Sequence, residues 1–282
     1  MIYGLIAMLG WGVSNFVAAQ LSRKIGALNA VFWNTVGVFT FMLLGLPLFH
    51  QNLFLASSYD FFILMAAGGF LALGGIAFYK GTSLGKVSLV SPLSASWPIV
   101  VAVVTIFSTH ESPGALKTLA LLLIFMGGLV ASLKLTKSTK IFSFSDPGIP
   151  YALLALGAWS FAFYLFGVVL TASPWLTANV YFVFWAALVT FAYGIHKRVK
   201  FSFTPYKTQL KLFLLFTVSA TCASISYSLG VRSLQATLTA AITNASPAVT
   251  TLLAWILIRE RLTWIQKGGI ISIIAGLIIL SL

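Results

Sequence analysis

Long apolar runs separated by short polar connectors make up nearly the whole chain. A helix needs about 20 mostly apolar residues to cross the hydrocarbon core of a bilayer. Ten segments qualify: 2–21, 27–49, 61–84, 87–108, 115–133, 149–170, 175–196, 210–231, 234–258 and 264–282. The pattern predicts an all-α integral membrane protein with ten transmembrane helices. No basic region precedes the first run, so we expect it to be a retained helix rather than a signal peptide.

The two halves of the chain share residues at a nearly constant spacing. The matching pairs are Gly81 and Gly230, Pro98 and Pro247, Glu111 and Glu260, and Gly127 and Gly276 at an offset of 149, with Trp11 and Trp159 at 148. We therefore predict two five-helix repeats, over 1–140 and 141–282. Because five is odd, the second repeat must be inverted, and inverted repeats around a midplane site are typical of secondary transporters. Duplication that merely enlarges a membrane protein is the alternative.

Composition and charge agree with a lipid environment. The chain is 60% hydrophobic and 7% charged, with a net charge of +13, whereas a soluble domain carries about 25% charged residues. No soluble basic face exists that could bind nucleic acid. Of 17 Lys and Arg residues, all but Lys117 and Arg232 lie in the odd-numbered connectors or near them at the adjoining helix ends. The positive-inside rule then predicts a multi-pass protein of the cytoplasmic (inner) membrane, with both termini outside.

Polar and aromatic side chains inside the apolar runs are the candidate substrate ligands, because polar groups within a membrane face the protein interior or water. The candidates are Trp11, Asn15, Asn34, Tyr79, Ser94, Trp97, Trp159, Tyr164, Trp185, Tyr227, Thr243 and Asn244. Aromatic rings and amides together suit amphipathic amino acids or organic cations. The alternatives are hydroxyls bonded to the i−4 carbonyl and aromatics placed at the membrane interface.

Several other residues have candidate roles. Pro98 and Pro247 are candidate hinges, because each removes a backbone hydrogen bond within a helix, although a passive kink is the alternative. Lys80 either extends its ammonium to the interface or binds a carboxylate or phosphate. Glu111 and Glu260 end helices and are expected to be structural. The single cysteine, Cys222, is expected to be a packed thiol.

Catalytic and metal-binding patterns do not occur in the sequence. The four acidic residues, Asp60, Glu111, Asp146 and Glu260, all lie outside the middle of a predicted helix. Chemistry would need converging acid, base or metal groups. We therefore expect neither an enzyme nor a cofactor or metal, and transport that does not depend on a proton gradient.

Three sets of residues resemble a known family. Gly10-Trp11-Gly12 with Asn15-Phe16, and the spaced sets Tyr79…Pro98…Glu111 and Tyr227…Pro247…Glu260-Arg261-Leu262-Thr263, resemble the duplicated EamA-type module of the drug/metabolite transporter superfamily. The resemblance spans the chain in two copies. It implies a two-bundle carrier with a central cavity and alternating access. His110-Glu111-Ser112 departs from the family's Gly-Glu-Arg, and family members are usually described with cytoplasmic termini, against the charge bias here.

The sequence thus predicts a secondary transporter of small polar or amphipathic metabolites, with amino acids favoured. The resemblance also admits sugars, choline-like amines or phosphorylated metabolites as substrates. Functions of another class are an intramembrane enzyme or a channel. The expected partners are a small-molecule substrate and membrane lipid, without nucleic acid, and the protein is expected to be a monomer or homodimer.

Overall fold

The computed structural model describes residues 1–85, 90, 93–109, 114–132, 146–202, 207–233, 236–259 and 262–281. Its helices are α1 (Ile2–Ile25), α2 (Ala27–Leu48), α3 (Ser58–Leu84), α5 (Trp97–Thr109), α6 (Ala115–Ser132), α7 (Ile149–Leu170), α8 (Trp175–His196), α9 (Lys207–Ser233), α10 (Ala236–Thr243), α11 (Ser246–Leu257) and α12 (Trp264–Ser281). Glu111, Glu260, Arg261 and the predicted boundary between the repeats lie outside the described residues.

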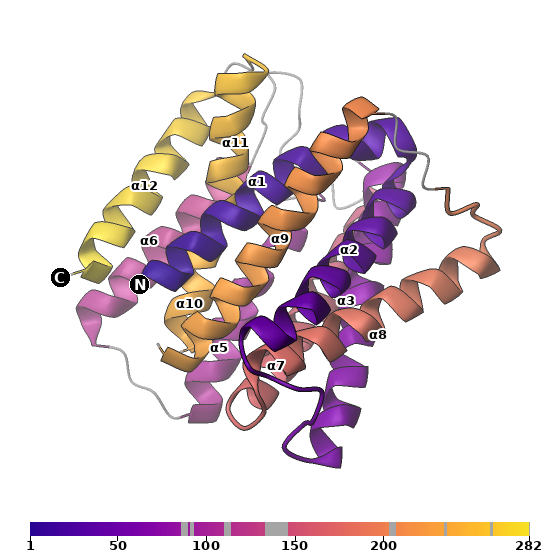
Figure 1. Ribbon diagram of the computed structural model, residues 1–282. Helices are drawn as coiled ribbons and strands as arrows, with labels where there is room; N and C mark the ends of the chain where they lie inside the picture. Colours follow the sequence, from indigo (N-terminus) through magenta and orange to yellow (C-terminus); the bar gives the residue numbers. More distant parts are fainter. Residues whose placement is uncertain are drawn as a thin grey trace.

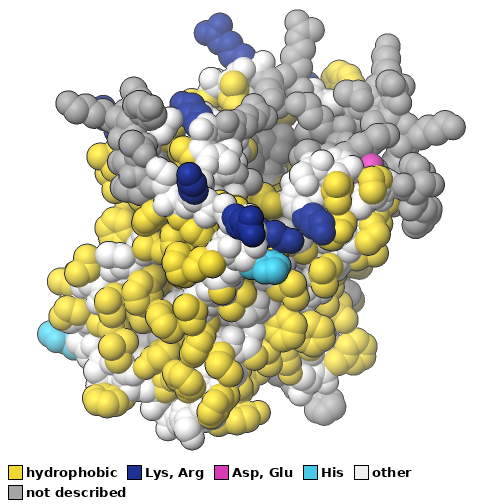
Figure 2. Space-filling view, turned by 90° about the vertical axis from the view of Figure 1, so that its right-hand side faces the viewer, with side chains coloured by type: hydrophobic (Ala, Val, Ile, Leu, Met, Phe, Trp, Pro, Cys, Tyr) yellow, Lys and Arg dark blue, Asp and Glu magenta, His cyan; other side chains and the backbone are white. Residues whose placement is uncertain are grey.

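Within the described ranges, seven helical stretches are long and apolar enough to cross a membrane. Three shorter apolar helices, Leu93–Ser108, Ala115–Ala131 and Trp264–Leu280, complete the predicted set of ten. Many large apolar side chains are exposed, among them Leu48, Phe54 and Phe107. On the face drawn in Figure 2, hydrophobic side chains form a broad yellow band, and the dark-blue Lys and Arg side chains gather towards one end. This distribution suits a surface solvated by lipid and confirms the all-α membrane fold.

The predicted fourth and ninth helices are interrupted at equivalent positions. In the second repeat α10 ends at Thr243 and α11 begins at Ser246. In the first repeat a turn at Ser96 precedes α5. Each interruption lies just before a proline, Pro98 or Pro247, which has no N–H to donate to the carbonyl four residues earlier. The prolines therefore divide these helices near the middle of the membrane-spanning stretch.

The two repeats are inverted, and the crossing of α6 and α12 shows it directly. A Cβ atom on Gly127 would lie 2.7 Å from the carbonyl oxygen of Gly269, and one on Gly276 would lie 2.8 Å from the carbonyl oxygen of Ala120. Adding 149 to Gly127 and Ala120 gives Gly276 and Gly269, so the two contacts are the same contact made twice. The early part of each helix meets the late part of the other, so the pair is antiparallel.

The other helices repeat the same symmetry. α1 packs along α9, and its equivalent α7 packs along α3 in the same way. α2 packs on its own equivalent, α8. In Figure 1 the α6–α12 pair and the α2–α8 pair lie on opposite sides of the molecule, and α1 and α9 run side by side between them. The interior of the fold is therefore formed by the α1–α9 and α3–α7 pairs and by the interrupted helices that contain α5, α10 and α11.

Candidate functional site

Four aromatic side chains from four helices meet in this interior. Trp11 (α1), Trp97 (α5), Phe163 (α7) and Tyr227 (α9) form what we call the aromatic cluster. The rings of Trp97 and Phe163 are stacked, with centroids 4.0 Å apart and an interplanar angle of 14°. The Trp11 ring lies 6.2 Å from Trp97, 5.7 Å from Phe163 and 5.3 Å from Tyr227. Tyr227 is buried, whereas the other three rings are partly exposed.

The local sequence explains how Trp11 and Trp97 reach this place. Trp11 lies between two glycines at which α1 touches its neighbours closely. A Cβ atom on Gly10 would lie 2.8 Å from the Ser219 carbonyl oxygen on α9, and one on Gly12 would collide with Val249 on α11. Trp97 is the first residue of α5, directly after the interruption. The glycines and the helix break therefore position both tryptophans through the backbone.

The equivalent of Trp11 in the second repeat lies outside the cluster. Trp159 packs against Phe78 of α3, with ring centroids 5.6 Å apart, as Trp11 packs against Tyr227. Its Nε1 donates a hydrogen bond of 3.2 Å to the Leu71 carbonyl. Trp159 therefore fastens α7 to α3.

Ser94 and Thr243 occupy equivalent positions and bond to their own helices. The Ser94 hydroxyl donates to the Val90 carbonyl at 2.8 Å, and the Thr243 hydroxyl donates to the Thr239 carbonyl at 3.0 Å. Both residues are buried. The alternative of i−4 bonding therefore describes these two hydroxyls in the structure.

The two asparagines predicted to share one site lie in different surroundings. Asn244 is 4% exposed, and its Nδ2 lies 3.4 Å from the Phe125 carbonyl of α6. Asn15 is exposed and lies one turn from Trp11 on the same face of α1. It makes no hydrogen bond within the described part of the chain. Asn15 thus lies one turn from Trp11 of the aromatic cluster, whereas the Asn244 amide contacts α6.

The remaining predicted residues lie on α2, α3, α7 and α8. Trp185 packs edge-on to Phe61 at 5.6 Å. Its Nε1 and the Oδ1 of Asn34 are buried without a hydrogen-bond partner among the described residues. Tyr79 is partly buried against Phe78, and Tyr164 is also partly buried. Within the part of the chain that the structure describes, none of these rings is in contact with the aromatic cluster.

Phe163 was not among the predicted residues. The chain has 24 phenylalanines, and nothing in the surrounding apolar run distinguishes this one. The offset of 148 that relates Trp11 to Trp159 also relates Asn15 to Phe163. A residue-by-residue alignment of the two repeats would therefore have drawn attention to it.

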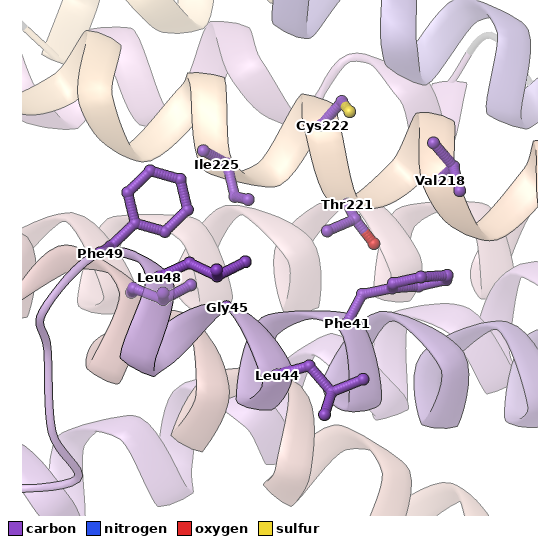
Figure 3. A pocket seen from close by; sticks show the side chains of 10 residues that line it. Phe41, Leu44, Gly45, Leu48, Phe49, Val218, Thr221, Cys222 and Ile225 are labelled. Atoms are coloured by element: carbon purple, nitrogen blue, oxygen red, sulfur yellow. The ribbon is translucent and has the colours of Figure 1, made fainter.

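A separate groove lies on the outer surface between α2 and α9. Figure 3 shows apolar side chains of both helices around it, and its volume is about 300 Å³. No predicted substrate ligand lines this groove. Cys222 does line it and is exposed, so the expectation of a packed thiol is wrong. The reason is that α2 does not cover this face of α9.

Lys80 lies near the end of α3 and is exposed. Its ammonium lies 4.9 Å from the ring centroid of Tyr151, which belongs to α7. A ring face attracts a cation through its quadrupole. This placement agrees with an ammonium that reaches the interface, and it keeps Lys80 away from the aromatic cluster.

Comparison with known proteins agrees with this architecture. The family model of the EamA-like transporter family matches residues 1–133 and again residues 146–282. A solved structure described only as the crystal structure of a protein is similar to this chain over 99% of its length and 94% of that structure's chain, with a TM-score of 0.79 and 14% identity. That likeness concerns the fold alone. No curated protein matches the sequence. The chain, in two inverted copies of one module, therefore belongs to the EamA-like transporter family of the drug/metabolite transporter superfamily.

Proposed function

We propose that this transporter is a secondary carrier that moves a small polar or amphipathic metabolite, with amino acids favoured, across the cytoplasmic membrane by alternating access. The observation that carries the proposal is the aromatic cluster. It gathers rings from both repeats at the point where α1 and α7 meet the start of α5, directly after the interruption in the predicted fourth helix. A site shared by both repeats near the midplane is what inverted-repeat carriers use.

The chemistry of this region suits an amino acid. The ring faces of Trp11 and Trp97 can receive an ammonium group or an apolar side chain. The exposed amide of Asn15, one turn away, offers a donor and an acceptor to a polar group. A sugar could stack on the same rings. A phosphorylated metabolite fits less well, because Lys80 stands beside Tyr151 rather than beside the cluster.

Alternating access is supported by the interruptions in the fourth and ninth helices. They occupy equivalent places in two repeats that are inverted relative to each other. A helix that has lost backbone bonds at one point can bend there at small cost. Pro98 and Pro247 would then be the hinges about which the central helices tilt to open one side of the membrane or the other.

The proposal can be tested on purified protein in two steps. Amino acids, sugars, choline and phosphorylated metabolites are first screened for their effect on the melting temperature, because a ligand that binds the folded state raises it. Compounds that stabilise the protein are then tested for counterflow in liposomes. We expect an amino acid to stabilise the protein and to exchange across the membrane.

Two variants sharpen the test. Trp97→Ala should weaken both stabilisation by the substrate and counterflow. Trp264→Ala, at a residue that is 84% exposed at the start of α12, should leave both unchanged. A channel would conduct solute without counterflow. Equal behaviour of the two variants would contradict the role given to the aromatic cluster.

A further inference from the structure

The two repeats make the same helix crossing on each side of the centre. On one side α1 crosses α11, and a Cβ atom on Gly12 would lie 3.0 Å from the Ser246 carbonyl oxygen. On the other side α7 crosses α5, and the Ser160 hydroxyl lies 3.4 Å from the Trp97 carbonyl oxygen. Gly12 and Ser160 are related by 148 residues, and Ser246 and Trp97 by 149. The backbones at the two crossings are therefore equivalent.

The side chains at these equivalent crossings differ in size and polarity. At the α5–α7 crossing, Trp97 and Phe163 fill the space with two stacked rings. At the α1–α11 crossing the equivalent residues are Ser246 and Asn15. Each aromatic side chain covers about 150–250 Å² when buried, which a hydroxyl and an amide cannot do. The first crossing is filled by its own side chains, and the second leaves a polar side chain, Asn15, exposed.

Trp11 connects the two crossings. Its ring contacts Trp97 and Phe163, and Asn15 follows it by one turn on the same face of α1. α1 continues from Asn15 towards Lys24, so Asn15 lies on the side of Trp11 that faces the Lys- and Arg-rich end. One side of Trp11 is therefore aromatic. On its other side lie the exposed Asn15 amide and the crossing that contains Ser246, a residue that is 9% exposed.

We propose that Asn15 and Ser246 form a polar subsite that binds the carboxylate of a neutral amino acid, while the apolar side chain of the amino acid lies against Trp11 and Trp97. An amide N–H and a hydroxyl both donate hydrogen bonds, which a carboxylate accepts. The substrate is thereby oriented along the axis from the α1–α11 crossing to the α5–α7 crossing. This inference rests on the proposed transport function and adds the substrate class and its orientation.

The inference excludes substrates that have an apolar or cationic part but no carboxylate or other anionic acceptor group. Choline can meet the rings but offers no carboxylate to Asn15. Binding should therefore favour L-leucine, L-threonine or L-phenylalanine over choline. The preference should disappear when the two polar residues are removed, because the rings alone do not distinguish the two kinds of molecule.

The experiment measures binding of these amino acids and of choline, by ligand-induced stabilisation, to purified variants. Asn15→Leu removes the amide at similar size, and Ser246→Ala removes the hydroxyl. Each should weaken amino-acid binding about 10- to 100-fold, the effect of one lost hydrogen bond to a charged group. Asn15→Phe gives the first repeat the ring that Phe163 supplies at the equivalent position of the second repeat. It should abolish binding, because the ring would fill the subsite. Leu9→Phe adds the same ring at a position that is 51% exposed on α1 and should bind normally.

The possible outcomes separate this inference from the function on which it rests. Wild-type protein that transports neutral amino acids, with unchanged affinity in the Asn15 and Ser246 variants, overturns the subsite and leaves transport standing. Transport of other solutes without binding of neutral amino acids overturns it as well. Wild-type protein that transports no solute overturns the proposed function itself.

A second measurement does not depend on any substrate. In a Cys222→Ala background, Asn15→Cys in liposomes should react readily with a water-soluble maleimide, and Phe163→Cys should react much more slowly, because its position is filled by the stacked rings. Melting temperatures taken without ligand identify variants that fail to fold. Equal reactivity at the two positions would show that the crossings do not differ and would overturn the inference.

Discussion

At the scale of single residues, the surroundings of a polar side chain decide whether it can stabilise the fold or bind a substrate. The Asn244 amide is buried against α6, where its Nδ2 lies 3.4 Å from the Phe125 carbonyl. A buried amide that loses its partner costs about 1–3 kcal/mol. Asn15 has the same chemistry but is exposed beside Trp11. The two asparagines should therefore affect different properties of the protein.

The first prediction uses this contrast. Asn244→Leu should lower the melting temperature and leave substrate affinity per folded molecule unchanged, because the amide serves the contact between α10 and α6. Asn15→Leu should leave the melting temperature unchanged and weaken substrate affinity. Thermal unfolding without ligand and affinity measured on the folded fraction check the two effects. Weakened affinity in Asn244→Leu at normal stability would show that Asn244 contacts the substrate.

Sequence periodicity could place residues on a helix face but could not say which neighbour that face meets. Asn15 and Asn244 both stand in apolar runs near a repeat motif, and only the packing of α6 against α10 and α11 separates them. Trp97 was predicted because it is an aromatic side chain inside an apolar run. Ser94 and Thr243 were chosen for their hydroxyls, which bond within their own helices.

At the scale of helices, apolar length predicted the elements well. The predicted helices over 149–170 and 175–196 have the bounds of α7 and α8. The ninth helix was predicted as one segment, 234–258, because the apolar character continues through Ala245. It divides into α10 and α11. Hydrophobicity reports burial in lipid and is insensitive to a break in the backbone hydrogen bonds.

The second prediction concerns the α6–α12 crossing. Gly127→Ala and Gly276→Ala should each destabilise the protein by about 1–3 kcal/mol, because each added methyl group would overpack the same backbone contact. The two losses should be similar, since the contacts are equivalent. Gly268→Ala is the matched control, because nothing lies within 4 Å of its Cβ position. Thermal unfolding in detergent measures all three, and equal stability of the Gly127, Gly276 and Gly268 variants would contradict the tight crossing.

At the scale of the whole molecule, the basic residues are distributed unevenly between the two sides. Lys24, Lys80 and Lys200 lie at or beyond the ends of α1, α3 and α8, which all finish on the same side. Lys117 starts α6 on the other side. Because cytoplasmic connectors are enriched in Lys and Arg, the first side should face the cytoplasm.

The third prediction follows from this bias. In a Cys222→Ser background, Lys200→Cys should react with an impermeant thiol reagent only after the cells are permeabilised. Lys117→Cys should react in intact cells. The reverse pattern would place both termini in the cytoplasm, as is usual in the family that the chain resembles, and would show that the charge bias does not govern insertion here.

The fourth prediction concerns energy coupling. Asp60 lies in the first turn of α3, where its backbone N–H donates to Ser57 and its carboxylate accepts from Ser173 at 2.6 Å. Asp146 precedes α7 and accepts from the Gly148 N–H. Neither carboxylate lies midway along a helix. Substrate exchange in liposomes should therefore proceed equally with and without an imposed pH gradient. Accumulation that strictly requires the gradient would show that another group carries the proton.

The glycine crossing of α6 and α12 also bears on how such a chain could have arisen. Each glycine surface fits the antiparallel copy of itself, so a half-length ancestor could have assembled as a pair only if its copies inserted in both orientations. Joining the two copies into one chain fixes one orientation for each. It also lets the halves diverge, so that one crossing carries Trp97 and Phe163 and the other Asn15 and Ser246. Two identical subunits would make two identical crossings, so they could not form a site that is aromatic at one end and polar at the other.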